Sequence, residues 1–406
     1  MIKNFVKKYI KNSFFGILDQ VFSSFLIFGI NFYFAYRSQL NEVGIFALIF
    51  TSIGFAQILQ QAILERPFLI KKNVFRYQIV IKRFLLVVLV LIFSILFSFY
   101  GDNNTSSVAL NDNFIVPWLF LGIVQLLFNL GRTYFYAIKK EVLAFYISFS
   151  STTIIFIFFL LIGPLIEDRL FPYVLTICLT KTIILILFFR KVELVENKFI
   201  SEDSSFKDYI LLIFISLSIY LRTRYPIFYL AESAFILAGI FEILRTITEL
   251  IIMPFRPISQ SLLSYLSEKS LEDIKNIFLK LVTFFVAISF TLSTVFYLIL
   301  NYLIFYFNIS IKDTVNIKVY LASFVFFNII NVPFNAFLLS RKKFFFEFLV
   351  KFIPAILLIS TLIIREINND IEIILLLLSM VTFIEFVFAL VFSIKTFKNT
   401  DLKISI

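Results

Sequence analysis

The sequence contains no histidine, a single cysteine and few charged residues. Of its 406 residues 16% are charged, whereas a soluble domain of average composition has about 25%. The absence of histidine excludes imidazole metal sites, Ser-His and Cys-His catalysis, and histidine proton relays. The lone Cys178 cannot form a disulfide within the chain. Together these absences exclude a soluble enzyme and a secreted domain held together by disulfides.

Apolar residues are abundant: 60% of the chain is hydrophobic, 58 residues are phenylalanine, and the mean hydropathy is +0.97. A helix needs about 20 apolar residues to cross a hydrocarbon core of ~30 Å. Windows of this length predict an all-α polytopic membrane protein with twelve transmembrane helices. The predicted spans are 14–36, 42–63, 84–100, 114–137, 143–163, 170–189, 209–230, 235–257, 281–302, 319–340, 346–364 and 371–394.

The positive charges predict the orientation of these spans. With the N-terminus inside, 27 of the 37 Lys and Arg residues fall in inside segments, five in outside segments and five within the membrane. An excess of Lys and Arg on the cytoplasmic side is the usual pattern. The net charge of +11 therefore reflects topology, and nucleic acid is not predicted as a partner. Connections this short leave no room for an extramembrane catalytic domain, so we expect no enzyme.

The most highly charged inside linker divides the twelve spans into six and six. The predicted order is a cytoplasmic tail (1–13), an N-terminal six-helix bundle (14–189), a cytoplasmic linker (190–208), a C-terminal six-helix bundle (209–394) and a second cytoplasmic tail (395–406). An even number of spans per half means that both halves enter from the same side, as in parallel repeats. The tripeptide Gly-Ile-Phe at 44–46 recurs at 239–241, at corresponding positions of the second and eighth spans.

Polar side chains recur in the first, second and fourth spans of each half, where they predict a polar cavity between the two bundles. The uncharged candidates are Gln57, Gln60, Gln61, Gln125, Asn129, Asn328, Asn331 and Asn335. The charged candidates in these spans are Asp19, Arg222, Arg224, Glu242, Arg245 and Glu249, and two further intramembrane cations, Lys181 and Lys351, lie in the sixth and eleventh spans. The segment 259–280 is amphipathic and is predicted to lie along the inner membrane surface.

Three segments resemble a known family. Residues 35–47 (AYRSQLNEVGIFA) are similar to the turn between the first two helices of oligosaccharide-lipid flippases, the O-antigen (Wzx-like) branch of the multidrug/oligosaccharidyl-lipid/polysaccharide (MOP) exporter superfamily. Residues 18–24 (LDQVFSS) and 261–270 (SLLSYLSEKS) fit the same pattern. The resemblance implies two six-helix bundles in a V, alternating access, and an undecaprenyl-diphosphate-linked oligosaccharide as substrate. It also implies a multi-pass protein of the bacterial cytoplasmic membrane.

This resemblance assigns a role to each candidate. A diphosphate would be bound by cations, with Arg222, Arg224 and Arg245 first and Lys181 and Lys351 second. The glutamines and asparagines would bind sugar hydroxyls. Asp19, Glu242 and Glu249 would take up a coupling ion, H⁺ or Na⁺, and no other cofactor is implied. Besides its substrate and the bilayer, the partners implied are other membrane proteins of polysaccharide assembly.

Each role has a structural alternative. The arginines can pair with Glu242 or Glu249 and only hold the second half together. Asp19 can pair with Lys181 or cap a neighbouring helix, and the glutamines of the second span can bond between helices. For the whole protein, the alternatives are a multidrug or cation-coupled exporter of the same superfamily and a membrane polysaccharide polymerase.

Overall fold

The computed structural model describes residues 11–37, 39–65, 77–100, 115–137, 141–162, 170–189, 206–267, 269–307, 314–364 and 370–404. These residues are helical apart from short turns, which confirms the all-α fold class. The linker 190–205 and most of the tail 1–13 lie outside the described residues.

Each of the twelve predicted spans coincides with a helix. The first half contains α2 (Lys11–Tyr36), α3 (Leu40–Gln60) with its π-helical continuation η2 (Gln61–Glu65), α5 (Tyr77–Tyr100), α6 (Ile115–Ala137), α7 (Glu141–Ile162) and α8 (Leu170–Phe189). The second half contains α9 (Phe206–Ser233), α10 (Phe235–Ile252), α11 (Phe255–Ser267), α12 (Leu271–Tyr306), α13 (Thr314–Ser340), α14 (Phe344–Ile364) and α15 (Ile371–Ile404).

In the part of the chain that the structure describes, nine helices are long and apolar enough to cross a membrane. A shorter apolar stretch, Val174–Leu187, lies in α8. α10 occupies the eighth predicted span and is apolar except for three charged side chains, those of Glu242, Arg245 and Glu249. The predicted span 235–257 is too long, because α10 ends at Ile252 and a turn separates it from α11.

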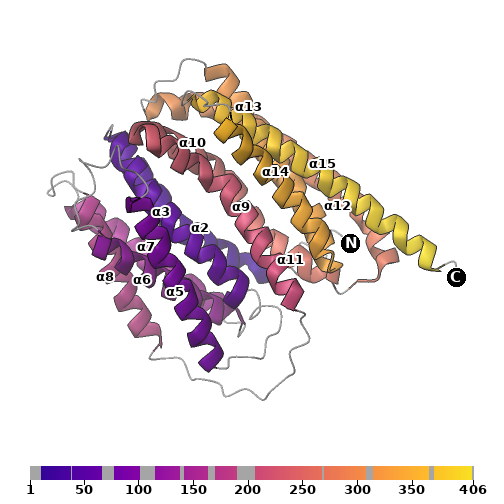
Figure 1. Ribbon diagram of the computed structural model, residues 1–406, viewed down its shortest axis with the longest axis horizontal. Coiled ribbons are helices and arrows are strands. Elements are labelled where there is room, and N and C mark those ends of the chain that lie inside the picture. The colour runs from indigo at the N-terminus through magenta and orange to yellow at the C-terminus, as the bar shows by residue number, and fades with distance from the viewer. Residues whose placement is uncertain are drawn as a thin grey trace.

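The two halves repeat one packing pattern, as Figure 1 shows with the first half in indigo to magenta and the second in salmon to yellow. In the first half α2 packs on α7, and α8 packs on both α6 and α7. In the second half the corresponding helices make the same contacts, since α9 packs on α14, and α15 packs on both α13 and α14. This agreement supports the parallel repeat that the span count predicts.

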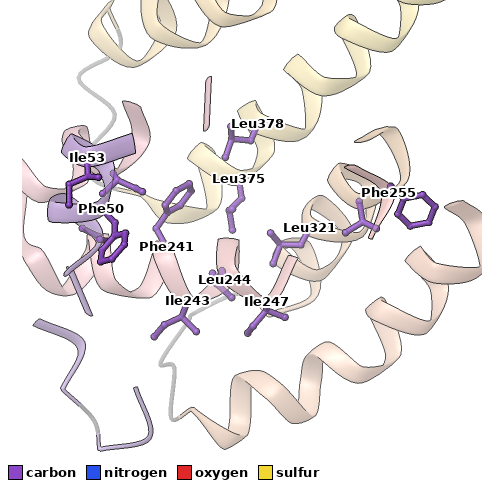
Figure 2. Close-up of a cluster of buried hydrophobic side chains, with 14 of the residues drawn as sticks. Phe50, Ile53, Phe241, Ile243, Leu244, Ile247, Phe255, Leu321, Leu375 and Leu378 are labelled. Carbon is purple, nitrogen blue, oxygen red and sulfur yellow. The ribbon is translucent and has the colours of Figure 1, made fainter. Parts of the chain in front are cut away.

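The halves meet along a seam formed mainly by α3 against α10 and α9, and by α2 against α10. Much of the seam is apolar: Phe50 and Ile53 of α3 lie beside Phe241 of α10, and all three side chains are buried (Figure 2). The Tyr220 hydroxyl of α9 donates a hydrogen bond to the carbonyl oxygen of Thr51. Side chains of both halves therefore share one continuous hydrophobic core.

The amphipathic segment 259–280 forms two helices instead of one surface helix. α11 ends at Ser267, and α12 then begins at Leu271 with Ser270 as its N-cap, whose hydroxyl accepts a hydrogen bond from the backbone N–H of Asp273. α11 packs on α13 of its own half and on α2 of the other. The guanidinium of Arg341 donates hydrogen bonds to the carbonyl oxygens of Leu266 and Lys269, which stabilises the end of α11.

Candidate functional site

The first half contains a polar cluster around Asp19 of α2, whose side chain is fully buried. Arg132 of α6 donates from Nε to both carboxylate oxygens, at 3.0 and 3.2 Å, and also pairs with Asp19 through Nη2. The hydroxyl of Tyr136 donates at 2.5 Å, and Ser148 of α7 donates a further hydrogen bond. These donors satisfy the buried carboxyl oxygens and tie together α2, α6 and α7.

Asp19 pairs with Arg132 and not with Lys181, so the predicted pairing with Lys181 is wrong. Arg132 lies within the predicted span 114–137, and α6 keeps this side chain largely buried, 13% exposed. It shares one helix face with Gln125 and Asn129, and this spacing is the sequence signal that places it inside the bundle.

Lys181 of α8 is buried, with 4% of its surface exposed. Its ammonium group donates a hydrogen bond to Oε1 of Gln125 on α6 and lies 4.9 Å from the centre of the Phe128 ring. The amide of Gln125 in turn donates to Asn129, at 3.4 Å. Among the described residues no carboxylate pairs with Lys181, so its positive charge has only neutral partners.

The second half contains two charged clusters. In the first, on α9 and α10, Arg245 binds Glu242 with both Nε and Nη2, at 2.7 and 2.6 Å, and reaches Glu249 at 3.4 Å. Arg224 lies 3.6 Å from Glu242. Asn31 of the first half also donates to Glu242, at 3.4 Å, so this cluster touches the seam.

The other cluster joins three helices of the second half. Glu385 of α15 pairs with both Arg222 of α9 and Lys351 of α14. Glu347 lies one turn from Lys351, at 3.9 Å. All four side chains are at most 7% exposed, so two cations and two carboxylates neutralise one another inside the bundle. The sequence did not predict Glu347 as part of a site, although it lies four residues from Lys351 on the same helix face.

The two halves differ in how their buried cations are paired. In the first half, Arg132 pairs with Asp19, half-buried Glu65 accepts a hydrogen bond from Gln60, and Lys181 has no carboxylate partner among the described residues. The clusters of the second half have four charges of each sign, namely Arg222, Arg224, Arg245, Lys351, Glu242, Glu249, Glu347 and Glu385. Lys318 of α13 is a further buried cation of the second half and lies beside the Tyr297 ring.

The glutamines of the second span do not share one exposed face. Gln60 is fully buried and donates to Glu65 and to the carbonyl oxygen of Leu126, both at 2.9 Å, whereas Gln61 is exposed and Gln57 half-buried. The chain changes from α-helix to π-helix between Gln60 and Gln61, so these two neighbouring side chains lie in different surroundings.

The asparagines of α13 differ from one another. Asn328 donates to the carbonyl oxygen of Phe324 at 2.8 Å. Asn331 is 2% exposed, and neither of its amide atoms has a hydrogen-bond partner among the described residues. Asn335 is half-buried, and its carbonyl oxygen likewise has no such partner. Asn331 and Asn335 therefore retain hydrogen-bonding capacity for a polar ligand or water.

A small cavity of about 20 Å³, enough for one water molecule, lies in the second half. Its polar lining comes from Thr223, Arg245, Thr248 and Glu249. Of the predicted site residues, the structure thus brings Arg224, Glu242, Arg245 and Glu249 together at one place. Arg222 and Lys351 lie together at a second place, and Lys181, Gln125 and Asn129 at a third.

No known protein family and no curated protein matches this chain. Solved structures do match over nearly its whole length. An outward-facing MATE multidrug transporter of the MOP superfamily is 12% identical with a TM-score of 0.59, over 95% of this chain and 99% of that one. The inward closed form of the lipid II flippase MurJ is 16% identical with a TM-score of 0.62, over 95% and 87%.

A third match is a MOP superfamily transporter from Pyrococcus furiosus, described as having a binding pocket of reverse polarity. It is 12% identical with a TM-score of 0.61, over 95% of this chain and 96% of that one. At these identities the comparisons establish the fold: the chain has the architecture of MOP superfamily transporters, a class that includes both drug exporters and a lipid-linked precursor flippase.

Proposed function

We propose that this protein is a flippase that moves an undecaprenyl-diphosphate-linked oligosaccharide from the inner to the outer leaflet of the bacterial cytoplasmic membrane, for surface polysaccharide synthesis. Three features support the proposal: the MOP transporter fold, the resemblance of residues 14–70 and 209–280 to oligosaccharide-lipid flippases, and a buried lysine in the first half, Lys181, without a carboxylate partner among the described residues. In this role no cofactor is required beyond a coupling ion.

The single observation that carries the proposal is the burial of the Lys181 amine beside neutral partners only, among the described residues. An ionisable side chain inside a membrane protein is costly and is usually retained for a function. In the part of the chain that the structure describes, Lys181 pairs with no carboxylate, while Gln125 and Asn129 beside it offer polar atoms to a ligand. An anionic group would be stabilised at this position and a cationic drug would be repelled.

In this proposal Lys181 binds a phosphate of the substrate, and the neighbouring amides bind polar groups next to it. Lys181 lies between α6 and α8 and is almost completely buried, so the ligand enters when these helices rearrange during transport. Arg222, Arg224, Arg245 and Lys351 are paired with carboxylates here, and each would have to leave its partner to reach a phosphate. Asn331 and Asn335 remain candidates for binding sugar.

A multidrug or cation-coupled exporter is the second candidate, because MATE transporters match this fold as well as MurJ does. That function needs carboxylates free to receive a cation. In the described residues Asp19 and Glu385 each pair with a cation of the chain itself, which disfavours it.

The proposal is tested by measuring lipid-linked oligosaccharide in cells with and without the gene, with the inner-leaflet and outer-leaflet pools separated. We expect accumulation in the inner leaflet on deletion and reversal on re-expression. Unchanged pools would favour export of small molecules, and unpolymerised repeat units on the outer side would indicate a polymerase.

Ion coupling is expected at Glu249 rather than at Asp19. Glu249 lines the small cavity, is 15% exposed and reaches Arg245 only at 3.4 Å. Replacing Glu249 with glutamine should therefore remove the response of transport to an imposed pH gradient in proteoliposomes, while the protein remains folded. Replacing Asp19 with asparagine should instead lower the amount of folded protein, because Arg132 is left buried without its carboxylate.

The two variants distinguish coupling from folding. A Glu249→Gln protein that still responds to the gradient would exclude coupling at this side chain. An Asp19→Asn protein with normal abundance and no gradient response would restore Asp19 as the coupling group.

A further inference from the structure

The two halves approach each other very closely where α3 crosses α10, at the repeated Gly-Ile-Phe tripeptides. A Cβ atom added to Gly44 would lie 2.0 Å from the carbonyl oxygen of Phe235. A Cβ atom added to Gly239 would lie 2.1 Å from the carbonyl oxygen of Leu40 and 3.2 Å from the backbone nitrogen of Gly44. The two glycines thus occupy equivalent places, each against the first turn of the opposite helix.

This contact is between backbones, so it cannot adjust by moving a flexible side chain. Atoms at ordinary van der Waals contact are about 3.5–4.0 Å apart, and an alanine at either position would force the helices apart by roughly 1 Å or more. Small residues allow membrane helices to approach this closely. The described glycines elsewhere on the seam differ, since a Cβ added to Gly54 would lie 3.5 Å from the ring of Tyr220.

Polar and aromatic contacts lie beside the crossing. Asn31 of α2 donates hydrogen bonds to Thr246 at 3.1 Å and to Glu242 at 3.4 Å, and all three side chains are buried. Glu242 follows Gly239 by one turn of α10. At the end of α2, the ring of Tyr36 stacks on Tyr306 of α12 at 5.7 Å. The charge distribution predicts that this end of both bundles faces outside.

We propose that Gly44 and Gly239 form the outer closure of the transport path, a backbone contact that only glycine permits, and that Asn31 fastens it by hydrogen bonding to α10. The seal forms when the first turns of α3 and α10 dock on each other's glycine. When the halves separate there, Glu242 loses its donor from the first half and keeps Arg224, Arg245 and Thr246 of its own half. Both parts of this inference hold whatever substrate is carried.

The closure is tested by the distance between spin labels on Asn41→Cys and Ile236→Cys, two exposed positions at the starts of α3 and α10, with the buried Cys178 replaced by serine. In proteoliposomes, we expect Gly44→Ala and Gly239→Ala each to raise the ratio of long to short distances at least about tenfold, equivalent to about 1.4 kcal/mol. Gly54→Ala is the matched control and should leave the ratio unchanged.

A second variant tests the hydrogen bonds from Asn31 to α10 without adding atoms where α3 crosses α10. Asn31→Leu removes both hydrogen bonds and should raise the same ratio several-fold. The proposal is overturned if the glycine variants give the distribution of Gly54→Ala. It is also overturned if the glycine variants fail to accumulate and Asn31→Leu matches the wild type.

Discussion

Replacing Lys181 with glutamine is expected to reduce transport of the lipid-linked substrate about 10- to 100-fold, the loss that follows from removing one charged hydrogen bond to a phosphate. The abundance and thermal stability of the protein should not fall. Lys181 has no carboxylate partner among the described residues, so the substitution leaves no buried carboxylate unpaired. The measurement is the rate at which the substrate reaches the outer leaflet, normalised to protein in the membrane.

The chain contains a matched control for this experiment. Lys318 of α13 is also buried, 6% exposed, and lies 4.8 Å from the centre of the Tyr297 ring, as Lys181 lies 4.9 Å from that of Phe128. Lys318→Gln should transport normally. Lys181→Arg should recover part of the activity because it keeps the charge. Equal rates for Lys181→Gln and Lys318→Gln would remove Lys181 from the site, and a loss of the Lys181→Gln protein itself would make its role structural.

Replacing Glu385 with glutamine is expected to destabilise the second half by about 3–5 kcal/mol, the cost of breaking a buried ion pair by removing one partner. The effect should be large because Glu385 neutralises both Arg222 and Lys351, which are 5% and 7% exposed. Thermal unfolding in detergent, together with the amount of protein in the membrane, measures it.

The double variant Arg222→Gln/Glu385→Gln should regain much of that stability. With both groups neutral, Lys351 keeps Glu347 as its partner. If the double variant is no more stable than Glu385→Gln alone, the ion pair is not what holds α9 and α15 together. If Arg222→Gln alone is as stable as the wild type but does not transport, Arg222 contacts the substrate.

Hydrophobic run length and the placement of Lys and Arg were enough to predict twelve spans, and each coincides with a helix. Run length succeeds here because backbone N–H and C=O groups within hydrocarbon must bond inside their own helix. The Gly-Ile-Phe repeat also marked equivalent helices, and it proves to lie where α3 and α10 cross. Polar residues within the spans located the buried clusters of both halves.

The charge partners could not be predicted in this way. Arg245 is one turn from Glu242, and this local pair was visible along the helix. Arg222 instead binds Glu385, and Asp19 binds Arg132, in each case more than 100 residues apart in the chain. Such pairs depend on which faces of distant helices meet, and a helix in apolar surroundings gives little sign of its rotation.

The sequence by itself therefore determined that this is a helical membrane protein of two similar halves with charged residues in its interior. Burying a charge or exposing backbone groups in lipid is so costly that the pattern of apolar runs and charged residues identifies the spans. Only the tertiary structure decided which charges cancel. It pairs Arg222, Arg224, Arg245 and Lys351 with carboxylates, leaves Lys181 with neutral partners among the described residues, and sets Gly44 against α10, because these outcomes depend on the relative position of helices that are far apart in the chain.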